Sequence, residues 1–254
     1  MHETIGEHPL WHLSFMPAGF NTVHADTVTI TWISMAIVLL AMGILARVHP
    51  VTKLSKRYTF MELIVTGISG QVETILGKNG LPFVPFIISL FLFIFVLNEI
   101  GLFPFVGKSP TADINTTAAL AIFVIVLIQI IGIARKGIGY YKHLVIKPLG
   151  LGIPMLPIML IDELARPVTL AMRLFGNIFA GEVLLVVVGA IIVAGVAIPF
   201  HMFGATFAFN ISKLANAAPV LIYGFNLIIG LIQAVVFTLL TTAYLITPLS
   251  DEAH

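Results

Sequence analysis

Residues 28–46, VTITWISMAIVLLAMGILA, carry no charged side chain, and they decide which solvent the fold must face. A helix over this stretch is long enough to cross about 30 Å of hydrocarbon with little tilt. The basic residues Arg47, Lys53, Lys56 and Arg57 follow at once. Because basic residues collect on the cytoplasmic flank of a span, this pattern predicts an N-terminus outside the cytoplasm.

The composition of the whole chain indicates the same environment. Of its 254 residues, 59% are hydrophobic and 10% are charged, whereas a soluble domain carries about 25% charged residues. The net charge of +1 argues against nucleic-acid binding, because no basic surface is present to neutralise phosphates. The absence of cysteine excludes disulfides and thiolate chemistry. Lipid must therefore be the main solvent of this chain.

Three outer spans are predicted, near residues 28–47, 81–104 and 114–134. Arg135 and Lys136 follow the third span, which returns the chain to the cytoplasmic side. The alternation of sides is therefore self-consistent.

Two further segments accompany these spans. Residues 58–80 mix apolar and charged side chains, which is typical of a helix lying along the membrane interface; a short cytoplasmic helix packed on protein is an equal alternative. Residues 1–27 lack the order of a signal peptide, and we expect an extracytoplasmic segment there. Residues 28–254 are expected to form a single integral membrane domain.

The last third of the chain is unusually long and apolar. No formally charged side chain occurs in 183–212 or in 214–250. Helices near 155–198 and 217–247 would exceed the hydrocarbon thickness at 1.5 Å per residue, and such mismatch is relieved by tilting. We predict a tilted hairpin that turns at Pro199 and the polar run after it, although ordinary spans broken at glycines are an alternative. The predicted fold class is thus all-α: a polytopic membrane protein with outer spans, one interfacial helix and a long tilted helical hairpin.

Arg173 is the most informative charged residue, because it lies between Met172 and Leu174 in apolar sequence. A central arginine costs roughly 2.5–3.5 kcal/mol on insertion scales, and it cannot lose its proton to escape that cost. Such a cation is either paired or used. A structural pair with Glu163, or snorkelling to the interface, is the alternative to a functional role.

Residues that follow Arg173 favour the functional role. Asn177 lies four residues on and so shares its helical face. Glu182 lies nine residues on, about 180° around the helix. This separation does not suit an intrahelical salt bridge, and it lets the carboxylate line a wet cavity elsewhere.

A second set of polar residues marks the last helix. Asn226, Gln233 and Tyr244 fall on nearly one face, with Gly230 close to it. Polar groups in so apolar a helix are costly unless they face protein or water. Interhelical hydrogen bonds, worth about 0.6 kcal/mol each, are the structural explanation. Together with Arg173, the set favours a path for protons or cations.

Two other motifs resemble binding sites but lack the spacing or the geometry that such sites need. The stretch GLFPFVGKS from Gly101 to Ser109 has one residue too many for a phosphate-binding loop and contains Pro104. We therefore expect no nucleotide site in this chain. His8 and His12 have metal-like spacing, but Pro9 between them weakens a helix, so we expect no metal and no cofactor.

The stretch RPVTLAMRLFGNIFAGE, from Arg166 to Glu182, closely resembles the signature of subunit a of the F-type ATP synthase membrane sector. PTADINTTAALA (110–121) resembles the start of that family's third span, and LIQAVVFTLLTTAYL (231–245) resembles its last helix. The resemblance covers nearly the whole chain from about residue 28.

This resemblance implies a stator subunit that provides two offset half-channels to the carboxylates of a rotating c-ring, coupling the flow of protons or sodium to ATP synthesis. Arg173 matches the essential arginine that faces the ring, while Asn177, Glu182 and Gln233 match positions that line a half-channel or position the arginine. Tyr244 also stands at a family position. The implied partners are c-ring subunits, peripheral-stalk b subunits and lipid of a bacterial inner membrane, with the C-terminus in the cytoplasm. No catalytic site for ATP is expected in this chain.

The chain departs from one bacterial pattern at Asn226, where a histidine works with the group at the glutamate position. We therefore expect the relay to lean more on Glu182 and water. Asp162 and Glu163, near the cytoplasmic end, are candidate groups of the exit path.

Two other functions remain as alternatives. A proton-coupled secondary transporter would commonly show internal repeats and broken helices around a midplane site, and neither is visible. An intramembrane enzyme would need a nucleophile–base pair or a metal cluster, and neither stands out.

Overall fold

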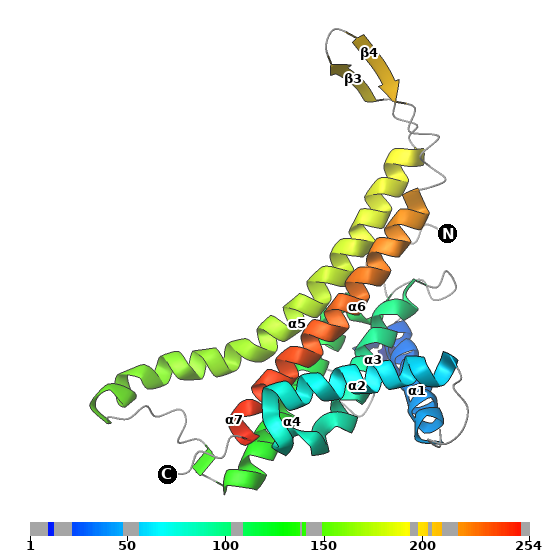
Figure 1. Ribbon diagram of the computed structural model, residues 1–254. Helices are drawn as coiled ribbons and strands as arrows, with labels where there is room; N and C mark the ends of the chain where they lie inside the picture. Colours follow the sequence, from blue (N-terminus) through cyan, green and yellow to red (C-terminus); the bar gives the residue numbers. More distant parts are fainter. Residues whose placement is uncertain are drawn as a thin grey trace.

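The computed structural model describes residues 10–12, 22–47, 56–102, 109–137, 139–140, 149–193, 198–202, 205–209 and 218–249. Its elements, in chain order, are β1 (Leu10–His12), β2 (Thr22–His24), α1 (Ala25–Arg47), α2 (Lys56–Leu76), the 3-10 helix η1 (Gly77–Phe83), α3 (Val84–Ile100), the 3-10 turn η2 (Pro110–Ala112), α4 (Ile114–Lys136), α5 (Leu149–Val193), β3 (Ile198–Met202), β4 (Ala205–Phe209), α6 (Ala218–Tyr244) and α7 (Ile246–Leu249). Long helices dominate the fold (Figure 1).

Four stretches of the described residues are long and apolar enough to cross a membrane, namely Ala25–Ile44, Glu62–Ile100, Ile114–Lys136 and Tyr223–Leu249. Their outer faces keep large apolar side chains exposed, as at Leu39 and Leu40 of α1. So extensive an apolar surface requires lipid or other apolar partners rather than water. The predicted polytopic helical membrane fold is confirmed.

Local sequence explains where α4 begins and ends. The Asp113 carboxylate accepts a hydrogen bond from the backbone N–H of Asn115 at 2.9 Å and so caps the first turn. Gly137 stops the helix because its φ of 61° is readily available only to glycine. The second outer span, predicted near 81–104, is shorter as the helix α3, because the 3-10 helix η1 with Pro82 inside it precedes α3.

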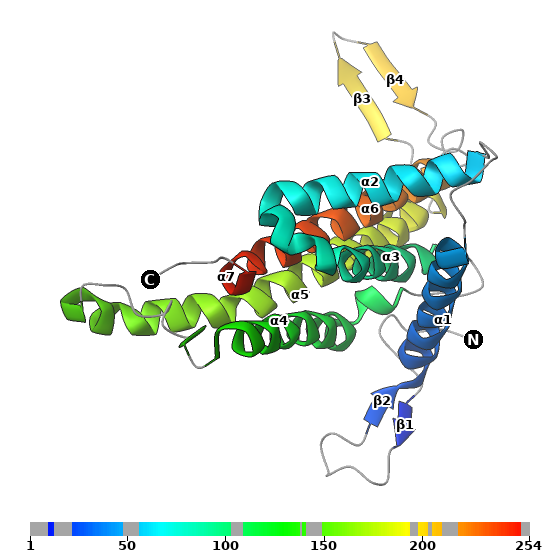
Figure 2. The same cartoon turned by 60° about the horizontal axis from the view of Figure 1, so that its bottom comes forward.

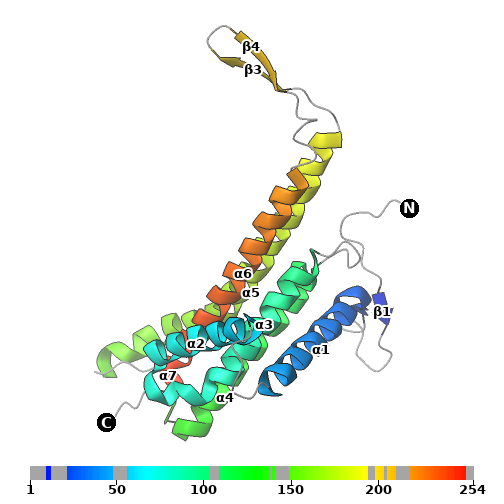
Figure 3. The same cartoon turned by 45° about the vertical axis from the view of Figure 1, so that its right-hand side comes forward.

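The core of the bundle lies where α3, α4, α5 and α6 meet. α3 packs between α1 and α6, while α4 runs along α5 (Figure 3). Each of the four central helices contributes a side chain with no exposed surface: Ile94, Val124, Leu174 and Phe237. This packing fixes how α5 and α6 face their neighbours.

Helix α2 lies across α3 and α6 (Figure 2). Val72 is buried beneath it, whereas Leu63 on its outer side is 70% exposed. The helix therefore packs on protein along one face and presents a mixed apolar and charged face outward. Its packing on protein agrees with one interpretation of residues 58–80, and its position at a membrane interface stays a prediction.

Helices α5 and α6 form the long hairpin expected from the sequence, running side by side in Figures 1 and 3. α5 spans 45 residues, which is about 68 Å at 1.5 Å per residue. Its described part runs from Leu149 to Val193, whereas the sequence predicted a helix near 155–198. Pro167 interrupts the hydrogen-bond ladder inside α5, and Figure 1 shows this helix bending along its length.

Two small antiparallel β-hairpins qualify the all-α prediction. β1 pairs with β2 within the predicted N-terminal segment, with Leu10 opposite His24. β3 pairs with β4, with Ile198 opposite Phe209. The turn expected at Pro199 is thus part of a strand, in which the apolar and aromatic sequence favours an extended backbone. The polar residues 210–216 of the predicted turn lie outside the described part of the chain.

Contacts between helix ends match the predicted alternation. His24 Nδ1 lies 2.5 Å from Asp113 Oδ2, joining the start of α1 to the start of α4. At the opposite end of α4, the Lys136 ammonium donates a hydrogen bond to the Thr247 carbonyl at 2.8 Å. These ends therefore segregate into two groups, as alternating spans require. The membrane face that each group occupies stays a prediction.

Candidate functional site

Arg173 lies on a face of α5 that the rest of the described chain leaves uncovered. Its neighbours Leu170, Ala171 and Leu174 are buried in the core, whereas Arg173 itself is exposed. No described acidic side chain lies within ion-pairing distance of its guanidinium. The cation is thus left available to a partner.

The surface around this arginine is apolar. Val168, Met172 and Phe179 are large, exposed side chains on the same helix. A permanent charge amid lipid-facing residues marks a functional position by default, because it must meet an anion or water. The alternative pair with Glu163 is not formed, because Glu163 binds a different arginine.

That arginine is Arg166, the centre of a separate polar cluster. Its Nη1 lies 3.0 Å from Glu163 Oε2, and its Nη2 lies 3.4 Å from Asp162 Oδ2. Gln129 of α4 donates a hydrogen bond to Glu163 Oε1. The Arg166 guanidinium also lies 5.2 Å from the ring centroid of Tyr244 on α6. Three of the candidate residues, Asp162, Glu163 and Tyr244, therefore gather here, away from Arg173.

Asn177 and Gln233 join α5 to α6 one turn beyond Arg173. The Asn177 amide donates a hydrogen bond to Gln233 Oε1 at 2.6 Å. Gln233 is 2% exposed, and its own amide nitrogen has no hydrogen-bond partner in the described part of the chain. The contact holds the two helices in register beside the arginine and leaves one buried donor available.

Asn226 meets α5 at Gly181. A Cβ atom at Gly181 would lie 2.5 Å from Asn226 Oδ1, so a larger residue would displace this side chain. Glu182 follows Gly181 in α5, and its side chain lies outside those described. The backbone of Glu182 therefore lies at the same height along the hairpin as Asn226.

The structure adds two residues that sequence reasoning did not select. The Asn98 amide donates a hydrogen bond to the Gly230 carbonyl at 3.1 Å. A Cβ atom at Gly230 would overlap Glu99 Oε1, so the glycine admits this carboxyl against α6. The available signal was a pair of adjacent polar residues inside an otherwise apolar span.

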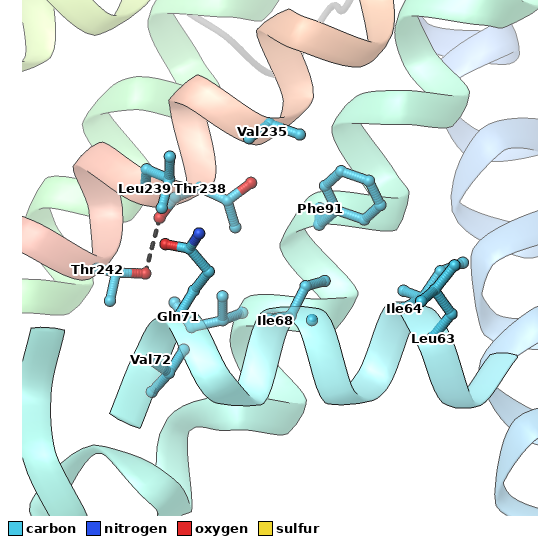
Figure 4. Close-up of a pocket in the computed structure, with 12 residues that line it drawn as sticks. Leu63, Ile64, Ile68, Gln71, Val72, Phe91, Val235, Thr238, Leu239 and Thr242 are labelled. Atoms are coloured by element: carbon cyan, nitrogen blue, oxygen red, sulfur yellow. Dashed lines mark hydrogen bonds between the residues drawn. The ribbon is translucent and has the colours of Figure 1, made fainter. Parts of the chain in front are cut away.

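An apolar cavity of about 360 Å³ lies between α2, α3 and α6 (Figure 4). Its polar residues are few, and two of them are satisfied within α6: Thr242 donates to the Thr238 carbonyl at 2.8 Å, and Thr238 donates to the Ala234 carbonyl. Gln71 is the third polar side chain in the lining of this cavity. This lining suits hydrocarbon rather than ions.

A metal centre finds no support among the described side chains, where no group of three or more histidines and carboxylates could hold an ion. His8, one of the pair with metal-like spacing, lies outside the described residues. The predicted absence of a metal there stays a prediction.

Comparison with known proteins identifies the family. The family model described as ATP synthase A chain matches residues 28–246. The chain is 35% identical to ATP synthase subunit a 3 of Pelobacter propionicus over 97% of this chain and 99% of that protein. It is 36% identical to ATP synthase subunit a of Desulforamulus reducens, covering 96% and 84%, respectively. ATP synthase subunit a of a Geobacter species is 34% identical over 97% of this chain and 99% of its own length. This chain therefore belongs to the ATP synthase A chain family.

Proposed function

We propose that this chain is the ion-translocating stator subunit of the membrane sector of a rotary F-type ATP synthase, and that it provides two offset half-channels for protons or sodium. Membership of the ATP synthase A chain family supports the membrane-sector role. The finer proposal rests on the surroundings of a few polar residues.

One observation carries the proposal: Arg173 is exposed on an apolar face of α5 and has no ionic partner among the described side chains. Two unit charges attract by roughly 4 kcal/mol when they lie about 4 Å apart at an effective dielectric constant of about 20. A passing c-ring carboxylate would therefore favour its ionised form beside Arg173 and release its ion. The same fixed charge would repel cations that move directly between the half-channels.

The α5–α6 contacts supply a frame for this charge. The Asn177–Gln233 hydrogen bond joins α5 to α6 next to Arg173. Asn226 lies farther along α6, against Gly181 of α5. In the proposed path, these amides and Glu182 line the half-channel that leads from the extracytoplasmic side. Because Asn226 does not titrate, Glu182 and water carry the proton there.

The Arg166 cluster fits the exit side of the proposed path. Asp162 and Glu163 offer carboxylates near the expected cytoplasmic end, and Tyr244 lies over the Arg166 guanidinium. Arg166 holds the side chains of Asp162 and Glu163 together through an ion pair with each. They would receive ions that leave the ring after rotation.

The driving energy is sufficient only for a ring with several sites. One charge that crosses about 100 mV gains about 2.3 kcal/mol, so several ions must pass for each ATP. The proposed assembly therefore includes c-ring subunits and peripheral-stalk b subunits in a bacterial inner membrane. The N-terminus lies outside and the C-terminus in the cytoplasm.

The proposal is tested by purifying the complex through a tag on this chain and reconstituting it in vesicles. We expect a ring of small two-helix subunits to copurify, and an imposed pH or sodium gradient to drive ATP synthesis. Solute uptake driven by the same gradient, with no ring in the preparation, would instead identify a proton-coupled transporter.

A further inference from the structure

The carboxyl group of Glu99 is enclosed without a hydrogen-bond partner. It lies near the end of α3, and neither of its oxygens reaches solvent or any donor among the described residues. The neighbouring Asn98 Oδ1 is buried and unpartnered as well. Three acceptor oxygens on two adjacent residues are thus buried with no described group to satisfy them.

The position of this group on α6 is informative. The Glu99 carboxyl rests against Gly230, to whose carbonyl the Asn98 amide donates. Gly230 lies between Asn226 and Gln233 on the polar face of α6, at spacings of four and three residues. The same polar face therefore meets α5 on one side and the Glu99 carboxyl on the other.

No described cation compensates this carboxyl. Helix α6 carries no formally charged residue from Ala218 to Tyr244. On the neighbouring elements, His24 pairs with Asp113 and Lys78 of η1 is exposed, and no described ion pair includes Glu99. Burying an isolated ionised carboxylate is highly unfavourable, so this group must hold a proton or bind a cation. A carboxyl with only a packing role would be expected to have donors around it.

We propose that Glu99 is a further ion-exchanging carboxyl of the path, positioned by Asn98 and admitted to the polar face of α6 by Gly230. It takes up the coupling ion from the extracytoplasmic side and passes it toward the amides of α6. This inference rests on the proposed function, and it assigns to α3 a part in the path alongside α5 and α6.

The test compares three variants in the reconstituted complex: Glu99→Gln, Glu99→Asp and the control Glu73→Gln. Glu99→Gln keeps the shape but cannot exchange a proton, Glu99→Asp keeps the carboxyl, and Glu73 is an exposed glutamate on α2. The quantity measured is the rate of passive proton flux through the membrane sector, down an imposed gradient and without ATP hydrolysis. Ring content and melting temperature of each complex are measured in parallel.

We expect Glu99→Gln to lower the flux about tenfold, equivalent to a barrier higher by about 1.4 kcal/mol. Ring content should stay at the wild-type level, Glu99→Asp should recover most of the flux, and Glu73→Gln should have none of the loss. Wild-type flux in Glu99→Gln would overturn the inference. A loss in Glu99→Gln that Glu99→Asp does not recover, or that follows a lower ring content, would also overturn it by assigning Glu99 a structural role.

Two further arms separate the possible failures. Repeating the flux measurement with a sodium gradient at fixed pH identifies which ion the carboxyl exchanges, because only the coupling ion responds to the variant. If the wild-type complex conducts neither ion, the proposed function itself fails. Wild-type conduction that survives Glu99→Gln refutes only the role of Glu99.

Discussion

Arg166 and Arg173 lie two turns apart on α5, yet their surroundings differ completely. Arg166 has two carboxylates and an aromatic ring within reach, whereas Arg173 has no described ionic partner and an apolar neighbourhood. Arginine keeps its charge in both places. The first is stabilised within the chain, and the second depends on something outside it. Residue type alone would not have separated these two roles.

The Asn177–Gln233 hydrogen bond predicts a measurable coupling between α5 and α6. We expect the variants Asn177→Leu and Gln233→Leu, alone and together, to give an interaction energy of about 0.6 kcal/mol in the unfolding free energy of the subunit in detergent. The reason is that each single change removes the same bond, so the double variant loses less than the sum. Strictly additive losses would show that the two amides do not interact.

Sequence reasoning identified most polar residues at this scale but could not assign their partners. Helical spacing placed Asn177 beside Arg173 and put Asn226 and Gln233 on one face, because spacing depends only on the chain itself. The contact of Glu99 with Gly230 joins residues far apart in sequence. Periodicity carries no information about such a contact, so Glu99 was passed over.

At the scale of elements, α6 is the helix around which the polar groups are arranged. Its polar face meets Asn177 and Gly181 from α5, Asn98 and Glu99 from α3, and Arg166 at its end. Small residues at two crossings allow the polar side chains to fit between the helices. The face thus serves packing and, in the proposed function, conduction.

Gly230→Ala is predicted to destabilise the subunit, because its new Cβ would overlap the Glu99 carboxyl. We expect a loss of about 1–3 kcal/mol in unfolding free energy, the usual cost of overpacking. Gly224→Ala on the same helix is the matched control, because nothing lies within 4 Å of its added Cβ. The control should be neutral or slightly stabilising. An equal loss in both variants would refute the close approach at Gly230.

The long hairpin shows where element prediction succeeds and fails. The uncharged sequence was sufficient to predict two overlong helices, because hydropathy and length are additive along the chain. α5 begins at Leu149, ahead of the predicted start near residue 155, and its backbone stays helical through Pro154 and Pro157 although proline removes a hydrogen-bond donor. The sequence placed a turn at Pro199, whereas the structure places this residue in β3.

At the scale of the whole molecule, the exposed apolar faces belong together with Arg173, which has no ionic partner among the described residues. Hydrocarbon can cover the apolar side chains, but it cannot neutralise Arg173. Arg173 therefore needs a partner outside this chain, and the proposed partner is the acidic ring that moves past α5. The sequence was enough to predict a membrane fold and the charge of Arg173. Only the structure could show that Arg173 has no ionic partner among the described residues.

The most direct test of the account is ATP-driven ion pumping by reconstituted complexes that carry Arg173→Ala, compared with Thr169→Ala one turn away on the same exposed face. We expect pumping to fall to background in Arg173→Ala while the ring content of the complex and its ATP hydrolysis site stay intact. Thr169→Ala should pump like the wild type. Coupled pumping by an assembled Arg173→Ala complex would contradict the central role given to this charge.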